Sequence, residues 1–495
     1  MYRSRWIAAV CAVVLGAGVV VSSSFPASAD DQGGTATQPT FSSLVDAIPG
    51  LANLTLPPSL DNALAGLPNG PLRDYDTPTK APGKVCPFVG DVPVSLPVVA
   101  SPLGTPLPGL AGIDLSQPAV STHVHGELCM SDDSLAQAKS GNPPAVLTLV
   151  HGITYGTYYW DFPYQPEKYS TVNYLDKAGF ATFNIDRVGD GASGHPLSPL
   201  VNAQSQAEVD HQLVQELKNG HVGGIPFGHV GLVGHSYGTV INWIESAMYN
   251  DTDIDIGTGY SDRVDPLTAG AFIAESTPAA LSPLESNQPW SIDPGYLQPL
   301  STARDLPQLY NAADVDPQVE KEDAALANTV TVGEVATFAE REYDGTHKNI
   351  HIPTFDIQGE YDIMTCGTNA EECATNATTT DNPVTLEKAA KRFTDWQGGA
   401  FSSQACFRAA VVPDAAHNVS LALNANQTQV QIAFFALEAM GTHGQNTKKY
   451  RDTCTTSGPS VFDDLPELTR LIPPAPLSPP PVSTIIDPII EYLGG

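Results

Sequence analysis

The 495-residue sequence predicts an α/β fold with a mostly parallel central sheet flanked by helices, an inserted cap and proline-rich terminal extensions. Short apolar runs bounded by turn residues recur along the middle of the chain, as expected for buried strands. A segment with helical spacing of its apolar residues lies between two of these runs. Strand, helix and strand in alternation indicate parallel strands joined by crossover helices.

The individual strands and helices follow from this pattern. The range 120–130 mixes apolar and polar residues as an edge strand does, and 145–150 is an apolar run between Pro-Pro and His-Gly. Further apolar runs predict strands at 180–185, 230–233, 267–274, 352–357 and 407–412. The predicted helices are 207–218, 239–249 and 427–440, and a helix-like patch covers 330–341.

The amino-terminal segment has the pattern of a secretory signal peptide. Arg3 and Arg5 precede an apolar run over 6–21, and Ala27-Ser28-Ala29 supplies the small residues of a cleavage site. The competing interpretation is a membrane anchor, but the run is shorter than the roughly 20 residues that usually span a bilayer. We expect a signal peptide at 1–29, a secreted, extracellular protein, and no stable membrane insertion after cleavage.

The amino-acid composition divides the rest of the chain into two extensions and a catalytic domain. Residues 30–119 are rich in Pro and Gly and predict an extended leader that wraps the catalytic domain, which we place at 120–445. The interval 275–348 is too long for an ordinary connection and predicts an inserted cap. Residues 446–495 become proline-rich again and predict a second extension.

Cysteine usage agrees with export. One of the seven cysteines lies in the signal segment, which leaves six, an even number that suggests three disulfides. Six cysteines allow about 15 pairings. The simplest pairs are Cys366–Cys373, Cys86–Cys129 and Cys406–Cys454.

The net charge of the chain argues against two classes of binding partner. The formal net charge is −31, which argues against nucleic acid and against electrostatic docking on anionic membranes. The acidic run at 251–255 lacks the glycine and the closing glutamate of a calcium loop, so we expect a solvated loop there. The thiols show no CxxC pair with matching histidines. We therefore expect no metal site and no organic cofactor, and the oligomeric state stays open.

The central chemical motif is Gly234-His235-Ser236-Tyr237-Gly238. It follows the apolar run at 230–233 and precedes a predicted helix, which is the strand–turn–helix context of a nucleophile elbow. In such a turn the serine hydroxyl projects above the sheet, and the glycines allow strand and helix to approach closely. Ser236 is therefore the candidate nucleophile.

A serine hydroxyl needs a base, and the base needs an acid that orients it. His417 fits as the base because it follows the predicted strand at 407–412 and precedes the closing helix. Asp362 fits as the acid because it occupies the turn after the strand at 352–357. Glu360, two residues earlier, and Glu275, after the preceding strand, are the rival acids.

Together these motifs resemble the α/β-hydrolase superfamily from about residue 146 to residue 440. The elbow, the Gly359-Glu360-Tyr361-Asp362 turn and the Ala415-Ala416-His417-Asn418 loop match in the chain order Ser, Asp, His. His151-Gly152 is similar to the family's oxyanion motif, although the extended HGGG form is absent. The segment 186–194 resembles the D-x-x-G-x-G-x-S loop, which is usually structural. The resemblance implies an α/β-hydrolase fold and an oxyanion hole formed by the backbone N–H groups of Ile153 and Tyr237.

The function expected from these residues is hydrolysis of carboxylic esters by a serine hydrolase of the carboxylesterase or lipase type. Aromatic residues at 155–162 either line a pocket for a small or medium lipophilic ester or pack the loop against the cap. A secreted aminopeptidase of the proline-iminopeptidase type is the rival enzyme, with cap carboxylates Glu320, Glu322 or Asp323 holding the substrate's amino group. A non-catalytic binding protein with the same fold is the alternative from another class.

Overall fold

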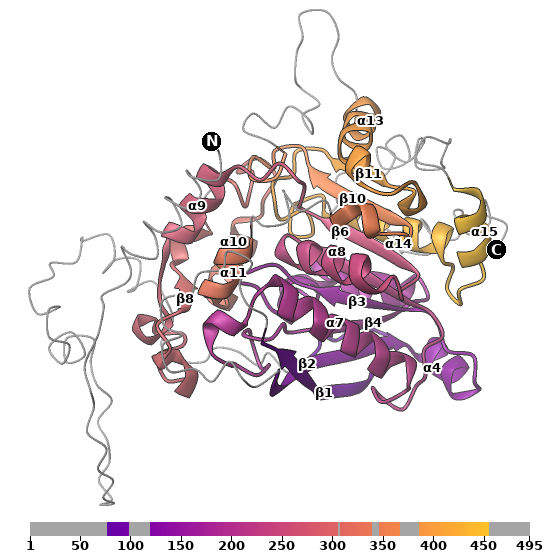
Figure 1. Cartoon of the computed structure of the whole chain (residues 1–495), viewed down its shortest axis with the longest axis horizontal. Coiled ribbons are helices and arrows are strands. Elements are labelled where there is room, and N and C mark those ends of the chain that lie inside the picture. Colours follow the sequence, from indigo (N-terminus) through magenta and orange to yellow (C-terminus); the bar gives the residue numbers. More distant parts are fainter. Residues whose placement is uncertain (1–76, 99–118, 305–306, 339–345, 367–385, 455–495) are drawn as a thin grey trace, which may run out of the picture.

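In the computed structural model, an eight-stranded sheet forms the centre of the molecule (Figure 1). The structure describes residues 77–98, 119–304, 307–338, 346–366 and 386–454. The strand order is β1-β2-β4-β3-β5-β6-β10-β11. The strands are β1 (Lys84–Pro97), β2 (Ala119–Ser131), β3 (Val146–Val150), β4 (Ala181–Ile185), β5 (Val230–His235), β6 (Ile254–Thr258), β10 (Thr354–Gly359) and β11 (Arg408–Val412).

The sheet is parallel from β4 to β11, whereas β1–β2 and β2–β4 pair antiparallel. Strands β3, β4, β5, β6 and β10 are buried along their whole length, as expected of a parallel sheet covered on both faces. Because the carboxyl ends of parallel strands lie at one edge, the loops that follow β3, β5, β10 and β11 are brought to the same edge of the sheet.

Helices cover the sheet. Helices α7 (Ala203–Lys218) and α8 (Tyr237–Tyr249) pack on each other (Figure 1). Helix α6 (Thr171–Lys177) packs with α14 (Ala425–Ala439). The remaining helices of the main body are α4 (Asp132–Lys139), α5 (Pro166–Tyr169), α13 (Leu386–Gln397) and α15 (Thr447–Thr453). Within the described ranges, no helix combines the length and apolarity needed to cross a bilayer.

Four expectations about the strands, the acidic loop and the extension are wrong. The range 267–274 lies in a helix, α9 (Pro266–Ala274), and the strand beside β5 is instead β6, part of which was expected to be a solvated acidic loop. Strand β1 falls in the range expected to be an extended leader, so β2 is flanked on both sides and is not an edge. Proline residues are tolerated in β1 because it is the edge strand, and its alternating burial shows the period of two.

The segment 275–348, which we call the inserted segment, contains a small antiparallel sheet of β7 (Ser276–Pro278), β8 (Tyr296–Pro299) and β9 (Val330–Thr331). It also contains α10 (Pro317–Leu326) and α11 (Val332–Thr337), so the helix-like patch at 330–341 is partly strand. In Figure 1 these elements gather beside α9 at one side of the molecule.

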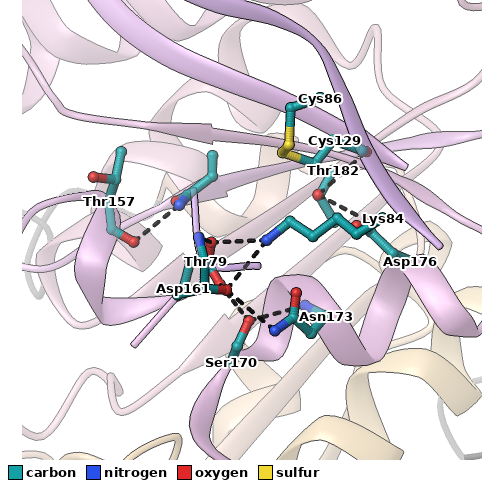
Figure 2. The surroundings of a disulfide bond; sticks show 11 residues. Thr79, Lys84, Cys86, Cys129, Thr157, Asp161, Ser170, Asn173, Asp176 and Thr182 are labelled. Carbon is teal, nitrogen blue, oxygen red and sulfur yellow. Dashed lines mark hydrogen bonds and ion pairs between the residues drawn. A yellow bond between two sulfur atoms is a disulfide. The ribbon is translucent and has the colours of Figure 1, made fainter. Parts of the chain in front are cut away.

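Two of the expected disulfides are confirmed, Cys86–Cys129 and Cys406–Cys454. Cys373, the expected partner of Cys366, lies outside the described residues, as do the signal segment at 1–29 and the chain after 454. Figure 2 shows the first disulfide beside a buried ion pair, in which Lys84 Nζ lies 2.9 Å from Asp161 Oδ2. Both charged side chains are almost fully buried. Strand β1 is therefore joined to β2 by a covalent bond and to the loop after β3 by paired charges.

Candidate active site

Ser236 stands at the junction of β5 and α8 in a strained backbone conformation. Its φ of 52° and ψ of −117° are unusual for a non-glycine residue, and its N–H donates to Thr258 O at 2.8 Å. Only glycine fits at the two flanking positions, because an added Cβ would collide with neighbouring backbone atoms. A Cβ on Gly238 would lie 2.2 Å from Val150 O, and one on Gly234 would lie 2.6 Å from Thr239 N. The turn therefore has the geometry of a nucleophile elbow.

Asp362 and His417 are brought into direct contact. His417 Nδ1 lies 2.9 Å from Asp362 Oδ2, and both side chains are nearly inaccessible to solvent. The carboxylate is held in place by the N–H groups of Met364 at 3.1 Å and Thr365 at 3.0 Å, which bond Oδ1, and by the Thr365 hydroxyl at 2.6 Å from Oδ2. The pair thus comes from the turns after β10 and β11, where the sequence predicts it.

The pair lies beside the elbow. The ring of His235, the residue before Ser236, has its centroid 4.9 Å from that of His417 and stacks on Tyr159 at 4.1 Å. Burial holds the pKa of His235 well below its usual range, with the neighbouring His417 lowering it further. A neutral His235 adds no positive charge next to the base.

The rival acids have other partners. Glu360 Oε2 accepts the N–H of Asp414 at 3.0 Å, which anchors the loop that carries His417. Glu275 Oε2 accepts the hydroxyl of Thr302 at 3.0 Å within the inserted segment. Of the three carboxylates weighed from the sequence, Asp362 is the one that contacts His417.

The predicted oxyanion donors come from two loops at the same edge. Tyr237 is the first residue of α8, and Ile153 follows β3 in His151-Gly152-Ile153-Thr154. The next residue, Thr154, has a φ of 64° and pairs with the inserted segment: its N–H donates to Thr329 O, and its carbonyl accepts from Asn328 N–H. The backbone that carries Ile153 is thus held in position from outside its own loop.

A buried ion pair that sequence reasoning missed supports this backbone. Arg304 donates to Thr154 Oγ1 at 3.0 Å and to Thr154 O at 2.8 Å, while its Nε lies 3.2 Å from Asp323 Oδ2. Asp323 also accepts hydrogen bonds from three tyrosine hydroxyls, those of Tyr155, Tyr158 and Tyr310. The two charged residues are 19 positions apart in the inserted segment, so no local sequence motif predicts that they form an ion pair.

This network also decides between the two interpretations of the aromatic residues at 155–162. The five aromatic side chains expected either to line a pocket or to pack are all 5% exposed or less, namely Tyr155, Tyr158, Tyr159, Trp160 and Phe162. Two of them donate to Asp323 on α10. They pack the loop after β3 against the inserted segment, and their hydroxyls satisfy a buried carboxylate.

A second buried cation contacts the loop that carries Ile153. Arg187, in the segment 186–194, contacts Glu334 of α11 and lies 2.9 Å from Asp190 Oδ2. Its backbone N–H donates to Nε2 of His151 at 2.9 Å, and its guanidinium donates to Gly152 O at 3.3 Å. Burial, followed by the charge of Arg187, lowers the pKa of His151 well below its usual range. The segment therefore has the structural role that its motif implies.

The chain belongs to the alpha/beta hydrolase family, whose model matches residues 149–430. This range contains all five residues predicted for the site. No curated protein matches the sequence.

Similar solved structures include a monoacylglycerol lipase of Paleococcus ferrophilus, at 14% identity over 58% of this chain and 92% of that one, with a TM-score of 0.36. A carboxylesterase of Bacillus subtilis is 14% identical over 63% of this chain and 87% of its own (TM-score 0.37). An esterase from Exiguobacterium antarcticum is 12% identical over 63% and 94% (TM-score 0.39). Similarities at such low identity and TM-score support no conclusion about activity or substrate.

Proposed function

We propose that this protein is a secreted serine hydrolase that cleaves carboxylic esters through an acyl-enzyme on Ser236. The observation that carries the proposal is the contact of 2.9 Å between His417 and Asp362, beside a serine held in a strained turn. Family membership supports it, because the order Ser, Asp, His along the chain is the order of this family.

In the proposed reaction, Asp362 accepts the Nδ1–H of His417, which leaves Nε2 unprotonated and able to act as a base. His417 takes the proton of Ser236 as the serine oxygen attacks the ester carbonyl. The N–H groups of Ile153 and Tyr237 stabilise the negative charge on the carbonyl oxygen, an effect often worth about 3 kcal/mol per donor. His417 then protonates the departing alcohol, and water releases the acid from Ser236 by the same steps.

The ester preference rests on the site's surroundings. An aminopeptidase of the rival type would use a carboxylate to hold the substrate's amino group, and Asp323 was one candidate. Its carboxylate is fully buried and already paired with Arg304 and three tyrosine hydroxyls. Glu322 accepts from the Gln318 side chain on the same helix. Two of the three rival carboxylates are thus engaged, which favours the ester, and a small or medium lipophilic ester is the substrate that we propose.

The assay that tests the reaction uses the purified protein and Ser236→Ala against p-nitrophenyl esters of increasing chain length and aminoacyl anilides. Fluorophosphonate labelling runs alongside. We expect ester turnover and one labelled site in the native protein, and neither in the variant. Labelling that persists in Ser236→Ala would refute the nucleophile. Activity confined to anilides would identify a peptidase, and a protein that neither labels nor turns over would be a binding protein.

Secretion is a separate part of the proposal. The disulfides Cys86–Cys129 and Cys406–Cys454 are consistent with an oxidising compartment. Expression with the complete signal peptide (residues 1–29) in a secreting bacterial host should release a protein whose amino-terminal residue is Asp30. Retention of residues 1–29 in the membrane fraction would contradict it.

A further inference from the structure

Three side chains converge at the carboxyl end of α8, at the end opposite Ser236. His211 projects from α7, Glu245 from the last turns of α8, and Asp251 from the loop before β6. One ligand atom from each lies within 4.8 Å of the others. His211 Nδ1 is 3.1 Å from Asp251 Oδ2 and 3.8 Å from Glu245 Oε1.

Glu245 is the unusual member. Its side chain is completely buried, and neither of its carboxylate oxygens has a hydrogen-bond partner outside the cluster. Oδ1 of Asp251 also lacks a hydrogen-bond partner. A buried, ionised carboxylate that faces only a second carboxylate and an imidazole is costly, so the group must be neutralised by a proton or by a cation.

The surroundings of Glu245 are acidic. Burial raises the pKa of Glu245 well above its usual range, and a side-chain hydrogen bond with Asp251 and the charges of Asp251, Asp210 and Asp255 raise it further. Lys218 is the nearby cation: its Nζ lies 3.8 Å from Asp251 Oδ2 and donates to the Asp251 carbonyl. The negative end of the α8 dipole adds to the field that favours a positive charge here.

We propose that His211, Glu245 and Asp251 form a binding site for a divalent transition metal of the zinc type. Ligands about 2.0–2.1 Å from a tetrahedral zinc lie roughly 3.3 Å from one another, close to the separations of His211 Nδ1 from the two carboxylates. One imidazole and two carboxylates suit zinc better than calcium, which takes 6–8 oxygen ligands. The other aspartates of the acidic run point elsewhere, because Asp253 bonds Val230 N–H and Asp255 accepts from Ser246.

Two neighbours would orient the ligands. The ring of Tyr249 stacks on that of His211, with centroids 3.6 Å apart and planes 9° from parallel. The side-chain amide of Gln215 donates to Asp251 Oδ2 at 2.5 Å. His211 and Asp251 are partly exposed, so water can complete the coordination from outside.

The proposed role of the metal is structural. Glu245 is nine residues after Ser236, which corresponds to about 14 Å along a helix that rises 1.5 Å per residue. The ion would instead fasten α7, α8 and the loop that leads into β6. The site is independent of the hydrolase proposal and goes beyond the expectation of a metal-free protein.

The test measures binding of Zn²⁺ to the chelator-treated protein by calorimetry, together with the visible spectrum of the Co²⁺ form and the Tm. We expect one equivalent of metal, the d–d bands of a four-coordinate Co²⁺ site, and a rise in Tm. His211→Gln and Glu245→Gln should each lower the affinity at least tenfold. His221→Gln is the matched control, because His221 is an exposed histidine that also pairs with a glutamate.

Several outcomes would overturn the site. Native protein that binds no Zn²⁺ at micromolar concentration would show that Glu245 is neutralised by a proton instead. Unchanged affinity in His211→Gln would mean that the ion binds elsewhere. Since Glu245→Gln affects a buried position, circular dichroism checks its fold, and the partly exposed His211 provides the second, milder variant.

Discussion

The imidazole Nδ1 of His417 lies 2.9 Å from Asp362 Oδ2, although the two residues are 55 positions apart in the sequence. The parallel pairing of β10 with β11 brings their following turns together, and Gly359 opposite Val412 sets the register. In the proposed mechanism, the Asp362 carboxylate keeps the proton of His417 on Nδ1 and so sets the tautomer of the imidazole.

Asp362→Asn should lower kcat by roughly 10³–10⁴-fold with little change in KM, because an amide can no longer hold the protonated Nδ1 of His417. Ester hydrolysis measured at several substrate concentrations separates the two parameters. Glu360→Gln is the matched control, since it removes a carboxylate from the same turn without touching His417. An equal loss of kcat in both variants would remove Asp362 from the assignment.

Asp323→Asn should destabilise the protein by about 3–5 kcal/mol, because it leaves the buried guanidinium of Arg304 without its counter-charge. The free energy of unfolding from urea titration measures the loss. The control is Glu322→Gln on the same helix, which is less buried and should change stability by no more than about 0.5 kcal/mol. Equal stability of the two variants would show that the Arg304–Asp323 ion pair contributes little to the stability of the fold.

Gly238→Ala should abolish activity and lower the Tm, because the added Cβ would lie 2.2 Å from Val150 O and 2.7 Å from His151 O. Both neighbours are backbone atoms, so the clash can be relieved only by moving β3 away from α8. Gly270→Ala is the control: its Cβ would meet nothing within 4 Å, and a helical alanine is expected to stabilise by about 0.5–1 kcal/mol. Full activity in Gly238→Ala would contradict the close approach at the elbow.

Asp176→Asn should become progressively more stable than the native protein as pH rises. Burial raises the pKa of Asp176 to about 8, whereas an unfolded aspartate titrates near 4. The folded state therefore holds a proton between about pH 4 and pH 8 that the unfolded state has lost, and native stability falls across that range. The neutral amide removes this dependence.

Thermal unfolding of the native protein and Asp176→Asn at pH 5 and pH 8 gives the comparison. The gap in Tm should widen at the higher pH, while the same change at exposed Asp133 on α4 should open no comparable gap. A gap that stays constant from pH 5 to pH 8 would mean that the Asp176 carboxyl is already ionised in the folded protein at pH 5.

Some strands and helices could be predicted from the sequence and others could not, for reasons that differ from one element to the next. β3, β4 and β5 are mostly apolar, so the sequence alone predicts them. β6 contains the buried Asp255, whose bond to Ser246 of α8 cannot be seen in the sequence, so its pattern looked like a solvated loop. The segment at 266–274 is apolar on every side, which periodicity cannot assign, and Pro266 at the helix start was the signal for α9.

What the sequence determined about this protein was the elbow around Ser236 and the candidates Asp362 and His417, because each stands next to a strand end that local patterns reveal. Only the tertiary structure shows which charged side chains from distant parts of the sequence contact one another. Arg304 with Asp323, Arg187 with Glu334, and His211 with Glu245 and Asp251 each join separate elements. Burial makes such charges depend on their partners, and only the folded chain brings those partners together.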